Sequence, residues 1–159
     1  MEKVQPQSPS QRANRTDRWS ETMLRALTSR VNNRWRLVSF RGTNGGEWCG
    51  VVDVVAIRKN TSDPGKEPLK RGDIFELILV QMKGGWAKDP TAHDLDRLDA
   101  VKEYYRAKEV VLFERRDGVC HFSKLRGREW EKSSVQKIFG RDNKKSLLPT
   151  REDESDGED

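Results

Sequence analysis

The chain has 159 residues, of which 33% are hydrophobic and 36% are charged, and its formal net charge is +5. This length and composition fit one domain with a modest core. No stretch approaches the roughly 18 consecutive apolar residues of a membrane span, and Met1 is followed by a polar run, so we expect neither a membrane segment nor a secretory signal. These features indicate a cytoplasmic protein.

The charge is distributed unevenly along the chain. Arg151–Asp159 contains one Arg and six acids, so residues 1–150 hold 30 Lys and Arg residues against 20 acids. A basic body indicates a polyanionic partner, for whose binding surface the acidic tail would compete. A solubilising tail on an ordinarily basic protein explains the charge equally well.

The first predicted elements are a helix and a strand. Residues 1–15 are polar and lack periodic hydrophobic positions, which predicts a disordered segment. A helix is expected from about Arg18 to Asn32, because apolar residues recur there at helical spacing. Arg34–Gly42 then alternates apolar with polar residues, which predicts a strand followed by a turn.

Two further strands carry polar residues within apolar runs. Strand alternation in Gly50–Ile57 places Asp53 on one face, and alternation in Phe75–Gly85 places Gln81 and Lys83 on one face. A buried, unpaired carboxylate costs several kcal/mol, on the order of magnitude of isolated charges, so Asp53 needs a cation, a metal or several hydrogen bonds. We therefore expect a carboxylate, an amide oxygen and an ammonium group to converge.

The next helix and strand are expected to form a crossover. Thr91 and Asp94 have the spacing of a capping box, before a helix that ends near Arg106. Glu109–Glu114 has the continuous apolar character of a strand buried on both faces. After a helical crossover, such a strand joins the sheet parallel to a neighbour.

The last elements complete an α/β fold. A short strand follows the turn at Asp117-Gly118, and Arg128–Gly140 predicts a short C-terminal helix. The predicted core order is α-β-β-β-α-β, with a central mixed sheet of about five strands flanked by helices. One domain then occupies residues 16–140, between the disordered segment and a flexible acidic tail at residues 141–159.

A family resemblance follows from the two polar strands. An Asp on one strand, followed by a (D/E/Q)-x-K triplet on the next, resembles the PD-(D/E)xK nuclease superfamily, whose fold is the restriction-endonuclease-like sandwich. The Gln version, VQMKGG, is most similar to the Mrr-type branch, and the likeness covers roughly Glu47–Glu114. It implies a metal-dependent endonuclease that hydrolyses phosphodiester bonds in DNA, with Asp53, Gln81 and Lys83 as its catalytic residues.

The resemblance also implies a role for each of these groups. Asp53, the side-chain oxygen of Gln81 and the backbone carbonyl of Met82 would bind Mg²⁺ or Mn²⁺, because hard cations prefer oxygen ligands. Lys83 would hold or deprotonate the attacking water and screen charge that develops on the phosphate.

The neutral Gln81 departs from the acid that most of the superfamily has at this position. A second carboxylate would compensate, and the candidates are Glu21 on the first helix and Glu47 near the start of the Asp53 strand. The structural alternative is a buried ion pair between Asp53 and Lys83, with Gln81 bonded to the backbone.

Nucleic acid would be held by glycines, an aromatic residue and basic residues near this site. These residues are Gly84, Gly85, Trp86, Lys88, Arg97 and Arg36. The basic residues are also explained as ordinary solvated side chains, the two glycines as a strand-ending turn, and Trp86 as a cap on the edge of the core. Because we expect no separate recognition domain in so short a chain, specificity would come from loops, from a homodimer or from a partner protein. The rival function is a catalytically inactive nucleic-acid-binding or adaptor protein on the same scaffold.

Overall fold

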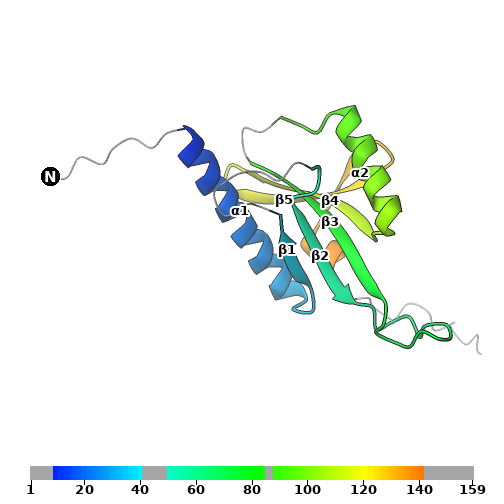
Figure 1. Ribbon diagram of the computed structural model, residues 1–159. Coiled ribbons are helices and arrows are strands. Elements are labelled where there is room, and N and C mark those ends of the chain that lie inside the picture. The colour runs from blue at the N-terminus through cyan, green and yellow to red at the C-terminus, as the bar shows by residue number, and fades with distance from the viewer. Residues whose placement is uncertain (1–8, 41–49, 85–87, 142–159) are drawn as a thin grey trace, which may run out of the picture.

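The computed structural model describes residues 9–40, 50–84 and 88–141, which form a six-stranded mixed sheet flanked by helices (Figure 1). The predicted α/β class and the order helix, three strands, helix, strand are confirmed. In chain order the elements are α1 (Pro9–Val31), β1 (Arg36–Ser39), β2 (Val54–Lys59), β3 (Phe75–Lys83), α2 (Ala92–Tyr105), β4 (Glu109–Arg116), β5 (Val119–Arg126), β6 (Glu129–Ser133) and α3 (Val135–Phe139).

The strands lie side by side in chain order from β1 to β6. Among the described strands only β3 and β4 are parallel, and the other neighbouring pairs are antiparallel. Parallel neighbours need a long crossover, which α2 supplies. The predicted parallel pairing of the Glu109–Glu114 strand is therefore confirmed.

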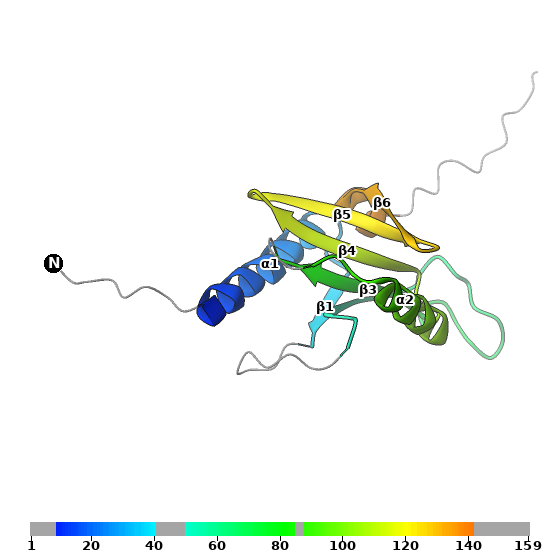
Figure 2. The same cartoon turned by 90° about the horizontal axis from the view of Figure 1, so that it is seen from above.

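Alternation along the central strands divides the core into two halves, one on each face of the sheet. Val80 of β3 and Phe113 of β4 pack with Leu24 of α1, whereas Leu79 of β3 packs with Leu98 of α2. Figures 1 and 2 show α1 and α2 on opposite sides of the sheet. We refer to these sides as the α1 face and the α2 face.

Helix α1 begins at Pro9, earlier than the expected start near Arg18, so residues 9–15 are helical rather than disordered. Pro is well suited to the first turn of a helix, because its missing N–H would have no intrahelical partner there. Once the apolar half of α1 packs on the sheet, extending the helix adds one hydrogen bond per residue fixed. Polar residues without periodicity can therefore continue it.

Helix α2 has the predicted capping box. The Thr91 hydroxyl accepts a hydrogen bond from the Asp94 amide, and the Asp94 carboxylate accepts one from the Thr91 amide. Arg106 follows the helix in the left-handed conformation and ends it, as expected. The hydrogen bonds from Thr91 hold the pKa of Asp94 below its usual value.

The prediction of one helix over Arg128–Gly140 is wrong. Residues Glu129–Ser133 form β6, which pairs with β5, and only Val135–Phe139 are helical. The cause is a tight turn at Gly127, whose φ of 61° is easily reached by a residue without a side chain. This hairpin adds the sixth strand.

Candidate functional site

Asp53 lies at an irregular point of the sheet, just before β2. Its amide donates to the carbonyl of Val80, and its own carbonyl accepts a hydrogen bond from the Phe40 amide, both at 3.0 Å. The ladder register already pairs Val80 with Val54. Two successive residues therefore oppose one residue of β3, as in a β-bulge, and bulges re-aim side chains.

The bulge directs the Asp53 carboxylate toward the backbone of β3. The Met82 amide donates a hydrogen bond of 2.6 Å to Asp53 Oδ2. The carboxylate thus occupies the position of a backbone carbonyl where the β2 ladder has stopped. The predicted strand over Gly50–Ile57 is regular only from Val54, so simple alternation does not describe the orientation of Asp53.

Gln81 belongs to the same side of β3 as Leu79 and Leu77, which pack in the core half beneath α2. Its side-chain oxygen Oε1 is buried and has no hydrogen-bond partner within the described ranges. An unsatisfied buried acceptor costs about 1–3 kcal/mol. Gln81 Oε1 is therefore free to accept a hydrogen bond or to bind a cation.

Lys83 ends β3 and is held by two carboxylates. Its Nζ lies 3.3 Å from Glu114 Oε1 and also forms an ion pair with Asp89, while its side chain is only 11% exposed. The hydrogen bond with Asp89 raises the pKa of Lys83, and burial lowers it by less. Because this ammonium group stays protonated, it is suited to screening negative charge and not to accepting a proton from water.

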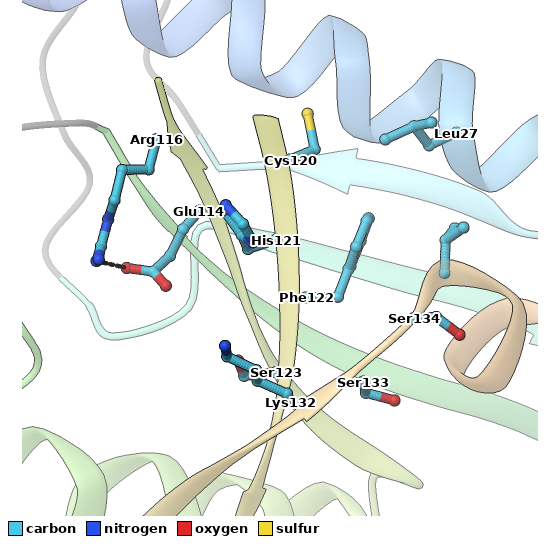
Figure 3. A pocket seen from close by; sticks show the side chains of 11 residues that line it. Leu27, Glu114, Arg116, Cys120, His121, Phe122, Ser123, Lys132, Ser133 and Ser134 are labelled. Atoms are coloured by element: carbon cyan, nitrogen blue, oxygen red, sulfur yellow. Dashed lines mark hydrogen bonds and ion pairs between the residues drawn. The ribbon is translucent and has the colours of Figure 1, made fainter. Parts of the chain in front are cut away.

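The sequence reasoning did not select Glu114, Asp89, Arg116 or His121. Glu114 is in cross-strand register with Lys83 on one side and with His121 on the other, and Arg116 Nη2 lies 3.4 Å from Glu114 Oε1 (Figure 3). The signal for Glu114 was present, because it is the last residue of a strand expected to run parallel to its neighbour.

Glu114, Arg116 and His121 border a hollow of about 420 Å³ (Figure 3). It exists because β6 pairs with β5 only as far as Phe122, opposite Ser133, after which the chain turns into α3. The beginning of β5 is therefore left without a neighbour on that side. Apolar side chains such as Leu27 and Phe122 also line the hollow, so Glu114 lies at the border of an open, largely apolar space.

Glu21 is not brought to the α2 face. Arg25 Nη2 lies 2.6 Å from Glu21 Oε1, and the Ser39 hydroxyl donates a hydrogen bond of 3.0 Å to Oε2. Both contacts lie beside α1, which packs on the opposite face from Gln81 and Lys83. The expectation that Glu21 joins these residues is therefore not met.

The other selected residues are not gathered into one surface. Arg36 is exposed on β1, Lys88 is exposed after β3, and Arg97 on α2 lies 3.7 Å from Asp94. Gly84 directly follows β3 and is half-buried. Three selected residues, Glu47, Gly85 and Trp86, lie outside the described residues, as does the acidic tail beyond residue 141.

Within the described ranges, no three His, Cys, Asp or Glu side chains gather as metal ligands. None of the helices described there combines the length and the apolar character needed to cross a bilayer. No protein-family model matches the chain, and no curated protein matches it. The function of the site is therefore inferred from the chemistry of its own residues.

Proposed function

We propose that the chain is a metal-dependent, endonuclease-like protein that hydrolyses phosphodiester bonds in DNA, with Asp53, Gln81 and Lys83 at its centre. The observation that carries this proposal is the buried Gln81 Oε1, which has no hydrogen-bond partner among the residues that the structure describes. It belongs to the residue before Met82, whose amide holds the Asp53 carboxylate at 2.6 Å. The Asp53 carboxylate and the Gln81 side-chain oxygen therefore belong to neighbouring positions at the same end of β3.

A third oxygen belongs to this group. In a strand, the amide and the carbonyl of one residue point to the same side. The Met82 carbonyl therefore points toward the side on which Asp53 lies. Carboxylate, amide and backbone oxygens together are ligands that Mg²⁺ and Mn²⁺ accept. A bound ion would polarise the phosphate and supply a nucleophilic water at neutral pH.

The protein residues have separate tasks in this proposal. Asp53 and Gln81 would hold the cation, while Lys83, whose raised pKa keeps it protonated, would place a positive charge beside the phosphate. Arg116 shares Glu114 with Lys83 and so offsets part of the negative charge of that carboxylate. The nucleophile does not need a proton acceptor on Lys83, because water bound to a metal loses its proton more readily.

The order of elements supports the same assignment. From α1 to β4 it is the α-β-β-β-α-β order that the resemblance to the PD-(D/E)xK superfamily implies. The bulge at Asp53 is also a feature that is common beside active sites.

The second candidate function is a nucleic-acid-binding or adaptor protein without catalysis. It is favoured by the fact that Lys83 is already paired with Glu114 and Asp89. An ammonium group neutralised by two carboxylates has less charge available for a phosphate. Such a protein would retain the scaffold and the basic surface but would not cleave its ligand.

Cleavage of supercoiled plasmid separates the two functions. Wild-type protein and Glu129→Gln, which alters an exposed acid on β6, should nick the plasmid with Mg²⁺ or Mn²⁺ and not with EDTA. Asp53→Asn and Lys83→Gln should reduce nicking at least a hundredfold while DNA binding persists. If the wild-type protein cleaves no duplex, single-stranded or branched DNA under these conditions, the adaptor function is correct.

A further inference from the structure

A polar cleft lies at the end of β2 that is remote from Asp53. It has a volume of about 390 Å³ and is formed where the end of α1 meets the end of β2 and the following loop. In Figure 1 the chain leaves β2 at the bottom of the sheet, near the last turn of α1. The six residues of β2 rise about 3.3 Å each, so about 20 Å separates this cleft from Asp53.

The floor of the cleft is a fixed ion pair. Arg58 Nε lies 2.5 Å from Glu76 Oε2, and the Arg58 guanidinium lies 4.5 Å from the centre of the Trp35 ring. Lys108 Nζ is 3.9 Å from the other oxygen of Glu76. The only acid that lines the cleft, among the described residues, is therefore already engaged by cations.

Four further cations line the cleft, namely Arg34, Lys59, Arg71 and Arg141. All four are exposed, and no carboxylate of the described ranges forms an ion pair with any of them. Like charges held together in a concave surface create a positive potential that concentrates anions. Binding of an anion would relieve their mutual repulsion.

Polar groups complete the wall of the cleft. The Asn60 side-chain oxygen accepts hydrogen bonds from the Ser62 and Asp63 amides at 2.9 and 3.0 Å. These bonds fix the start of the loop, so the Thr61 and Ser62 side chains line the cleft. Hydroxyl groups beside guanidinium groups are typical contacts for phosphate oxygens.

We propose that this basic cleft, defined by Arg34, Lys59, Arg71 and Arg141, binds the phosphodiester backbone of a nucleic acid strand without a metal ion. Arginine presents several N–H donors in a planar fork that matches phosphate oxygens. Trp35 is buried beneath Arg58, at 4% exposure, so no aromatic face is offered to a base there. The cleft therefore recognises the backbone and does not read sequence.

This inference is independent of cleavage, because the cleft is distant from Asp53 and Gln81. Its test is fluorescence anisotropy in EDTA with a labelled oligonucleotide of 20 nucleotides. The cleft variant is Arg34→Gln with Arg71→Gln. The matched control, Arg18→Gln with Arg106→Gln, removes the same charge at two other exposed positions, on α1 and directly after α2. Circular dichroism checks that both variants are folded.

The cleft variant should bind at least tenfold more weakly than wild type, and the control should change affinity less than threefold. The logarithm of the binding constant should also fall less steeply with the logarithm of the salt concentration. The slope should be smaller by about 1.4 in the cleft variant, because each lost phosphate contact to a single strand contributes about 0.7. Equal weakening in both variants would overturn the proposal, because it would show diffuse electrostatic attraction. Displacement of the oligonucleotide by a mononucleotide at matched phosphate concentration would overturn it too, because a small phosphate ester would then be the ligand.

Discussion

The carboxylate of Asp53 accepts a hydrogen bond from the Met82 amide across 2.6 Å, at the point where the ladder between β2 and β3 ends. A side chain thereby satisfies a strand amide that lacks a neighbouring strand. The same contact holds the carboxylate beside the segment that carries Gln81 and Lys83. One hydrogen bond thus satisfies the Met82 amide at the end of the ladder and also fixes the position of Asp53 in the proposed site.

Removal of this carboxylate should destabilise the fold. Asp53→Ala leaves the half-buried Met82 amide without its acceptor, so we expect the free energy of unfolding to fall by about 1–3 kcal/mol. Asp53→Asn retains an acceptor oxygen and should lose clearly less. Urea denaturation of both variants in EDTA measures the difference. Equal losses would mean that the hydrogen bond does not stabilise the bulge.

Mn²⁺ should stabilise the Gln81→Glu variant against unfolding more than it stabilises the wild-type protein. Without metal, the new carboxylate is partly buried near Asp53, and the variant should be less stable than wild type. With Mn²⁺ it should gain more, because a ligand at 100 times its Kd stabilises the native state by about 2.7 kcal/mol. Thermal unfolding with Mn²⁺ and with EDTA measures this gain. Gln136→Glu on the exposed side of α3 is the control, and an equal gain there would contradict the prediction.

Glu109 should contribute to stability against acid. Burial alone would raise its pKa, but hydrogen bonds from Arg126 and Lys124 outweigh burial, so the pKa of Glu109 lies below its usual value. Because the folded pKa is the lower one, the ionised form stabilises the fold above the unfolded pKa of about 4.3. That stabilisation is lost as pH falls through the folded pKa.

Glu109→Gln should therefore be less stable than wild type at pH 7, and the difference should shrink below about pH 4, near the unfolded pKa of a glutamate. Urea midpoints measured from pH 7 to pH 3 show this. Glu103→Gln, on the exposed side of α2, should leave the profile unchanged. Parallel profiles for wild type and Glu109→Gln would contradict the role of the ion pairs.

Much of the fold could be predicted from sequence because local patterns determined it. The capping box at Thr91 and the continuous apolar run at Glu109–Glu114 predicted α2, β4 and their parallel crossover. The hairpin at Gly127 was missed because a single glycine turn separates two short strands, and the second strand resembles a polar helix in composition.

The candidate site was less predictable because its geometry depends on an irregularity. Alternation identified the shared side of Gln81 and Lys83, but the bulge at Asp53 has no clear pattern in the chain. The partners of Lys83 depend on strand register, which placed Glu114 opposite it. Glu21 was selected on its helical position and on the family resemblance, but α1 covers the opposite side of the sheet, which keeps Glu21 away from the α2 face.

The most direct test of the proposed site is calorimetric titration of Mn²⁺ into wild-type protein and Asp53→Asn, with Glu129→Gln as the control. We predict that wild type and Glu129→Gln bind one ion per chain, and that Asp53→Asn binds it at least tenfold more weakly. If wild type binds no Mn²⁺, or if Asp53→Asn binds it as tightly as wild type, Asp53 and Gln81 do not form a metal site.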